Sequence, residues 1–166
     1  MAPLHAFRIA PFAMGLAVLS ACSTGGGQPP AVSQPAGTEA AYCPPVVQRE
    51  GTSVLRRGEG DALQYVASIS QTSRSCRVID GVLHIEVGIA GRVMPGAAAP
   101  SGQVGLPLRV VVVRGSEVLY SNLGRIGVPI SQGSGAQPFT YVDRAIRLSE
   151  PASRQVNIQV GFDEQN

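Results

Sequence analysis

The sequence predicts an all-β domain, an antiparallel β-sandwich, and three observations lead to this prediction. Apolar and polar residues alternate along several segments, as they do in strands with one buried and one solvated face. Turn residues separate these segments at intervals of roughly 8–12 residues. After residue 22, no window shows the apolar periodicity of a helix. The chain has 166 residues, which is long enough to bury one core.

The first segments of the expected domain are short. Pro44–Arg49 and Thr52–Arg56 are expected at a sheet edge, because proline is tolerated only at an edge or at the start of a strand. Leu63–Ser70 then alternates. We expect Arg74–Ile79 to follow it after a polar turn, so that these two segments form a hairpin.

The clearest alternation runs from Leu83 to Val93. Its apolar positions point to one face, and His84 and Glu86 stand on the other, more polar face. Gly88 and Gly91 within this segment indicate a bulge or a bend. The predicted inner positions are Leu83, Ile85, Val87, Ile89 and Val93.

The second half of the chain continues the pattern. Leu106–Val113 and Val118–Val128 are expected to form a hairpin around the turn at residues 114–117. Leu106–Val113 has apolar residues on both faces, which favours a central strand. Phe139–Leu148 is a weaker strand candidate, and Val156–Phe162 alternates clearly.

About seven short strands of this kind predict an immunoglobulin-like or fibronectin-like antiparallel sandwich, with a small β-barrel as the alternative. The chain has no tryptophan, and its cysteines come early, so the immunoglobulin hallmark is missing. Only 14% of the residues are charged, and the formal net charge is +2. Such a weak charge does not favour binding to nucleic acid.

The beginning of the chain has a different character. Arg8 precedes the apolar run Ile9–Leu19, which is too short for a membrane-spanning helix, because such a helix needs about 20 residues. The run leads into Leu19-Ser20-Ala21-Cys22. This stretch resembles the lipobox of bacterial lipoproteins, and the rest of the chain is similar to small uncharacterised outer-membrane lipoproteins of Gram-negative bacteria.

The resemblance implies a signal peptide over residues 1–21, cleavage before Cys22, and lipid (palmitate and further acyl chains) on Cys22. Two or more acyl chains hold a protein stably on a membrane. Ser23 is not the aspartate that favours retention in the inner membrane, so the resemblance implies the outer membrane and a domain that faces the periplasm. Composition predicts a flexible tether over residues 22–41 and the β-sandwich domain over residues 42–166.

Two cysteines remain once Cys22 is assigned to lipid. Because an exported chain meets an oxidising compartment, we expect a disulfide between Cys43 and Cys76. Two buried free thiols are the alternative.

No motif indicates catalysis, a metal or a cofactor. His84 and Glu86 make only part of a metal site, which needs three or four ligands, so a surface pair is the simpler interpretation. Glu59 and Asp61 offer too few oxygens for calcium. Arg49 and residues 56–57 form the one basic concentration, which is better explained by solvation than by contact with lipid.

Binding remains the expected function, by a sheet edge or by a loop. The loop between residues 95 and 103 is the candidate binding loop, because rigid sandwiches often build sites on loops. Tyr120 and Tyr141 would have to be exposed to serve a glycan. We therefore expect a non-enzymatic lipoprotein that binds another envelope protein. The alternatives are a peptidoglycan- or polysaccharide-binding module and an inhibitor of a periplasmic enzyme. The candidate loop residues are Pro95, Gly96, Pro100 and Gly102.

Overall fold

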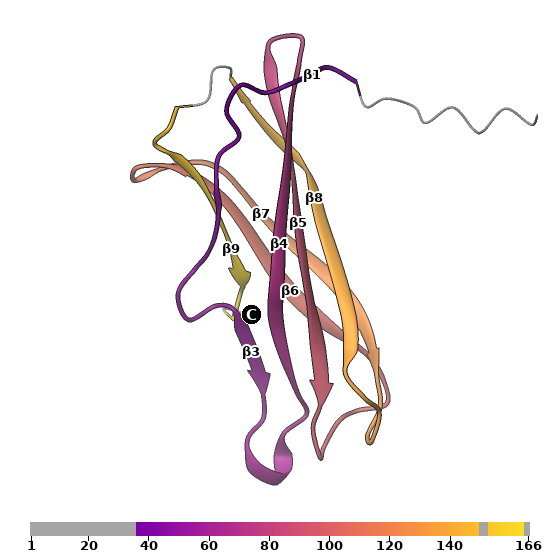
Figure 1. The fold of residues 1–166 in the computed structure, drawn as a ribbon. Coiled ribbons are helices and arrows are strands. Elements are labelled where there is room, and N and C mark those ends of the chain that lie inside the picture. The colour runs from indigo at the N-terminus through magenta and orange to yellow at the C-terminus, as the bar shows by residue number, and fades with distance from the viewer. Residues whose placement is uncertain (1–35, 150–152, 165–166) are drawn as a thin grey trace, which may run out of the picture. The chain divides into compact units, whose positions relative to one another are not determined.

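The computed structural model describes residues 36–149 and 153–164, which contain nine β-strands and one short 3-10 helix (Figure 1). The predicted signal peptide, Cys22 and residues 23–35 lie outside the described residues. The elements are β1 (Thr38–Glu39), β2 (Val46–Gln48), β3 (Val54–Arg57), η1 (Gly60–Ala62), β4 (Tyr65–Ile79), β5 (Val82–Pro95), β6 (Gly102–Arg114), β7 (Glu117–Ile130), β8 (Gln137–Ser149) and β9 (Val156–Phe162).

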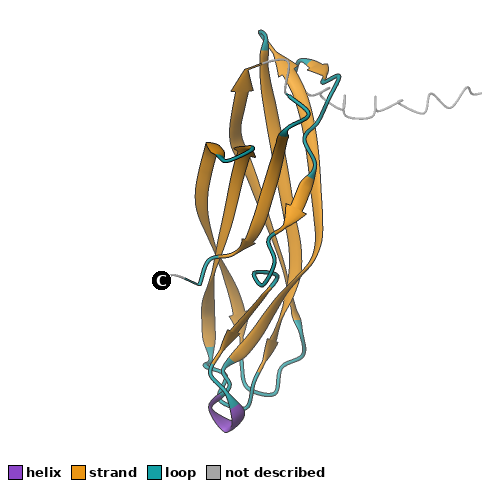
Figure 2. Ribbon diagram, turned by 90° about the vertical axis from the view of Figure 1, so that its left-hand side faces the viewer, coloured by secondary structure: helices purple, strands orange, loops and turns teal. Residues whose placement is uncertain are grey.

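The strands form two sheets, which we name sheet A and sheet B. Sheet A has the order β1-β4-β5-β8, with β3 also paired to β4, and sheet B has the order β2-β9-β6-β7. All pairs are antiparallel except β2 with β9, which is parallel. No described strand pairs across the two sheets, so the domain is the predicted sandwich and not the alternative closed barrel. Strands dominate the described chain in Figure 2.

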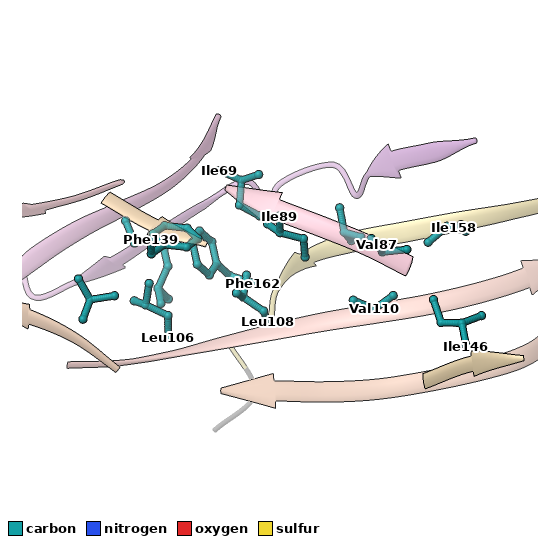
Figure 3. Packing of buried hydrophobic residues seen from close by; sticks show 14 of the residues in the cluster. Ile69, Val87, Ile89, Leu106, Leu108, Val110, Phe139, Ile146, Ile158 and Phe162 are labelled. Atoms are coloured by element: carbon teal, nitrogen blue, oxygen red, sulfur yellow. The ribbon is translucent and has the colours of Figure 1, made fainter. Parts of the chain in front are cut away.

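The core lies between the two sheets and consists of the residues that alternation places inside. All five predicted inner positions of β5 are fully buried. Leu106, Leu108 and Val110 of β6 face them from sheet B. Phe139 of β8 and Phe162 of β9 join the two layers, with ring centroids 6.1 Å apart (Figure 3). Burial of such side chains stabilises the fold by roughly 1.5–3 kcal/mol each.

The predicted hairpin between Leu63–Ser70 and Arg74–Ile79 is wrong. Residues 65–79 form one continuous strand, β4, which pairs along its whole length with β5. The polar residues at the centre of this segment are exposed strand residues and not a turn. A register shift between Ile69 and Gln71 leaves Ser70 as an extra residue, and such a β-bulge changes which residues face the core. The reversal comes later, at Asp80 and Gly81, which both have positive φ.

Other predicted elements hold. β6 and β7 form the expected hairpin, and β6 is central, between β9 and β7. The short segments β2 and β3 lie at sheet edges. The irregularities expected in β5 occur instead in its two neighbours, at Ser70 of β4 and at residues 144–145 of β8. Thr38 and Glu39, which composition assigns to the tether, pair with β4 as β1.

Candidate functional site

The two lateral sides of the sandwich differ, and the difference defines the candidate site. On one side β7, the edge of sheet B, lies against β8, the edge of sheet A. Polar side chains join these two strands. Tyr120 and Asn122 come from β7, and Tyr141 and Asp143 come from β8. We name this group the seam cluster.

Asp143 is the centre of the seam cluster. Within the described residues it is the only buried polar or charged side chain, with 3% of its surface exposed. Its carboxylate accepts hydrogen bonds from the Tyr120 hydroxyl at 2.9 and 3.0 Å, from Asn122 Nδ2 at 2.9 Å and from the backbone N–H of Ala145 at 2.9 Å. A buried carboxylate is costly unless donors surround it, and here they do.

The two tyrosines belong to the same network. Asn122 Nδ2 also donates to the Tyr141 hydroxyl at 3.0 Å. Burial and the hydrogen bond to Asp143 raise the pKa of Tyr120 well above its usual range. Burial is also the main cause that raises the pKa of Tyr141, and the negative charge of Asp143 adds to this effect. Both residues are half-buried and close the seam. Neither is an open aromatic platform of the kind that a glycan-binding module uses.

A glycine allows Tyr141 to reach across the seam. A β-carbon on Gly124 of β7 would overlap the Tyr141 ring and hydroxyl. The absence of a side chain at Gly124 therefore lets β8 approach β7 closely. This side of the sandwich is closed by direct packing and by buried hydrogen bonds.

The opposite side of the sandwich is open along the middle of β4. Away from β5, β4 pairs with β3 over residues 65–68 and with β1 over residues 77–78. Two further backbone bonds, from Ile69 N to Ser53 O and from Ala40 N to Cys76 O, extend these contacts. Between them, Ser70–Ser75 has no strand partner on this side within residues 36–149 and 153–164. We name Ser70–Ser75 the open edge.

The path of the chain explains the open edge. After β1 the chain leaves sheet A, joins sheet B as β2 beside β9, and returns to sheet A as β3. Figure 1 shows the path of the chain from β1 to β3. The Cys43–Cys76 disulfide, with Cα atoms 5.6 Å apart, holds the departing chain against β4. The disulfide that the sequence predicts is therefore formed, and it marks one end of the open edge.

Backbone groups of the open edge point outward. The Cys76 carbonyl faces β1, and backbone groups alternate in direction along a strand. Thr72 and Arg74 therefore direct their N–H and C=O groups to the same side as Cys76. A hollow of about 590 Å³ lies beside this edge, lined by Glu39, Cys43 and Arg74 among others. An edge of this kind can accept an additional strand.

The predicted binding loop has a structural role. Pro95 ends β5 and Gly102 begins β6, so the loop carries the chain from sheet A to sheet B. Gly96 N donates to Gln64 O at 2.8 Å, and Gln132 Nε2 donates to the carbonyl of Ala97 at 2.6 Å. These contacts make the loop an ordered connection, and its part in binding stays a prediction.

The acidic and histidine candidates lie in two places, with His84 and Glu86 on β5 and Glu59 and Asp61 at η1. Glu86 is paired with Arg144 and not with His84, with 3.5 Å between Arg144 Nε and Glu86 Oε1. Glu59 and Asp61 are exposed at η1. Across the described chain, no three His, Cys, Asp or Glu side chains are grouped closely enough to hold a metal ion.

Comparisons with protein-family models, with curated proteins and with solved structures found no match to this chain. In the part of the chain that the structure describes, no helix is long and apolar enough to cross a membrane. The sequence and the geometry of the domain therefore carry the functional argument.

Proposed function

We propose that this protein is a lipid-anchored, non-enzymatic accessory protein of the outer membrane, whose periplasm-facing domain binds a segment of another envelope protein. The lipobox at residues 19–22 supports the anchor. The observation that carries the binding function is the open edge, where β4 lacks a strand partner from Ser70 to Ser75 within the described residues. The bound segment adds as a strand between β1 and β3.

The chemistry of the open edge selects the partner. Main-chain hydrogen bonds supply affinity in strand addition, and side chains beside the edge supply specificity. Arg74 is exposed at the edge and disfavours pairing with a second copy, because two like charges would meet. A partner segment that carries an acidic residue opposite Arg74 is favoured, because opposite charges on paired strands attract each other.

Photocrosslinking in cells tests the proposal. A photoreactive residue at Ser73, on the open edge, is expected to capture one discrete envelope protein. The same residue at Ser121, exposed on β7 beside the closed seam, is expected not to capture it.

A pair of substitutions at one position identifies the interaction as strand addition. Thr72→Pro removes a backbone N–H that points away from β5, so β4 keeps its bonds to β5 and capture from Ser73 is lost. Thr72→Ala keeps the N–H and is expected to capture normally. Equal capture by wild type and Thr72→Pro, with both proteins folded, would contradict the proposal.

A further inference from the structure

A second feature lies on the outer face of sheet A, at the end where β1 pairs with β4. Arg77 of β4 is in register with His84 of β5, and His84 is in register with Arg147 of β8. His84 lies between the buried residues Leu83 and Ile85, so this row points away from the core. Three strands thus place three basic side chains side by side.

The row borders a hollow of about 390 Å³, which we name the basic hollow. Arg144 and Glu86 form its next row, and Glu86 is its single carboxylate. Three guanidinium groups and one imidazole therefore face one carboxylate. The charged and polar residues that line the basic hollow are Ser75, Arg77, His84, Glu86, Arg144 and Arg147.

Hydrogen bonds in the hollow do not neutralise its charge. Arg77 Nε donates to the Ala36 carbonyl at 2.7 Å, and Arg147 Nη1 donates to the carbonyls of Arg144 and Ile146 at 2.7 and 2.8 Å. These acceptors are neutral, so they orient the guanidinium groups and leave their positive charges uncompensated. Neighbouring like charges across strands are unfavourable by themselves. An anion in the hollow would relieve this repulsion.

The position of the hollow indicates which anion it meets. Arg77 contacts Ala36 and Gly37, where the described domain begins, and residues 23–35 connect this point to Cys22. A chain of that length reaches at most about 45 Å even when it is fully extended. Arg56 and Arg57 of β3 pair with the other end of β4, about 35 Å away along the strand by the usual rise per residue. Among the described basic groups of sheet A, the basic hollow therefore lies nearest to the residue at which the connection to Cys22 enters the domain.

We propose that the basic hollow binds phosphate headgroups of anionic phospholipids in the membrane that carries the anchor, and so orients the domain on that membrane. This inference rests on the proposed lipid anchor at Cys22. The arginines supply the charge and the N–H donors, and the exposed Ser75 lies beside them on β4. The anchor holds the protein at the membrane, and the hollow decides which face of sheet A meets it.

The test uses the full lipidated protein on vesicles of phosphatidylcholine, with and without phosphatidylglycerol. A photoreactive residue replaces Ser75 in the hollow or, as a positional control, Met94, which is 50% exposed on the other end of the same face. Phospholipid adducts are expected from Ser75 in the vesicles with phosphatidylglycerol, and few from Met94 or from pure phosphatidylcholine.

Charge variants identify the groups that bind. Arg144→Gln with Arg147→Gln is expected to lower the adducts from Ser75 about tenfold or more, because each basic residue near an anionic surface adds to the free energy of binding to that surface. Arg56→Gln with Arg92→Gln removes the same charge from two exposed positions elsewhere on the outer face and is expected to have little effect.

The outcomes separate the two proposals. A protein that does not float with either kind of vesicle would overturn the anchor. A protein that floats with both, but gives equal adducts from Ser75 with and without phosphatidylglycerol, would overturn the basic hollow as a membrane contact. Inorganic phosphate, with chloride at matched ionic strength as control, should compete with the headgroups and lower the adducts. Binding of inorganic phosphate that the Arg144→Gln, Arg147→Gln variant abolishes, together with no adducts from Ser75 on anionic vesicles, would assign the hollow to a soluble anion and contradict the membrane proposal.

Discussion

At the scale of single residues, the seam cluster shows how a polar group can hold two apolar sheets together. Asp143 is buried at the place where the edges of the two sheets meet, and its oxygens accept hydrogen bonds from two side chains and one backbone amide. Such a network stabilises only when all of its members are satisfied. We therefore expect small substitutions at the seam to change the stability of the fold and the titration of its tyrosines.

Gly124→Ala tests the close approach at the seam. The added β-carbon would overlap the Tyr141 ring, so we expect a loss of roughly 1–3 kcal/mol in the free energy of unfolding, the usual cost of overpacking. Gly105→Ala on β6 is the matched control, because no atom lies within 4 Å of its added β-carbon. Urea denaturation measures both. A Gly124→Ala protein as stable as Gly105→Ala would show that the seam is not tightly packed.

Tyrosine titration tests the electrostatics of the seam. The pKa of Tyr120 and that of Tyr141 are raised in the folded protein, so folding favours their neutral forms. Their contribution to stability is complete below the pKa of an unfolded tyrosine, about 10, and is lost as the pH rises above it. Tyrosinate absorbance should therefore show Tyr120 and Tyr141 of the folded protein ionising above the pH range that is usual for tyrosine.

A control links that titration to individual residues. Tyr120→Phe should remove one late-ionising tyrosine and weaken the fall in stability above pH 10, because the group with the raised pKa is gone. If Tyr120 and Tyr141 of the folded wild type titrate at the usual pKa of tyrosine, the seam is open to solvent.

At the scale of the elements, β4 organises the open side of the sandwich. It is one long strand, yet its outer edge is paired only at its two ends, by β3 and by β1. The Cys43–Cys76 disulfide holds the chain at the point where it leaves sheet A for sheet B. The open edge therefore depends on a covalent link as well as on strand pairing.

Removal of the disulfide tests this dependence. Cys43→Ala with Cys76→Ala opens a link between residues 33 apart, which should lower the free energy of unfolding by roughly 3–4 kcal/mol in the chain-entropy description. Urea denaturation with and without dithiothreitol measures the loss. The double variant, which has no bond to reduce, should be insensitive to the reductant, whereas wild type should be destabilised. A wild-type protein that the reductant leaves unchanged would contradict the prediction.

At the scale of the whole molecule, the two proposals assign separate tasks to separate parts of the domain. In these proposals, the open edge binds a partner segment, and the basic hollow, on the outer face of sheet A, binds phosphate groups of the membrane. Both depend on the anchor that the lipobox implies. Anchoring can be tested without reference to either surface.

Cys22→Ala provides that test. In the bacterial lipoproteins whose lipobox residues 19–22 resemble, the lipid is attached to this thiol and cleavage occurs directly before it. We therefore expect the variant to appear in the soluble fraction or as an uncleaved precursor. Cell fractionation and intact-protein mass measure both outcomes. A variant that is processed and membrane-bound like wild type would refute the lipid anchor.

The sequence by itself determined the fold class, the inner faces of the strands and the cysteine pair of the domain. Alternation with a period of two is a local property, so it can be read within a single strand such as β5 or β9. The same local reasoning fails in β4, where polar residues at the centre of a strand look like a turn. There, pairing with β5 on the other side outweighs the local pattern.

Only the tertiary structure decided which edges are closed and which are open. The seam cluster joins residues that are 19–23 positions apart, and the row Arg77–His84–Arg147 joins three strands. These juxtapositions follow from strand order and register, which are set by contacts between segments that are distant in the sequence. A one-residue slip would turn each of these side chains to the other face, and for this reason the surfaces that carry the proposed function emerge only when the strands are paired.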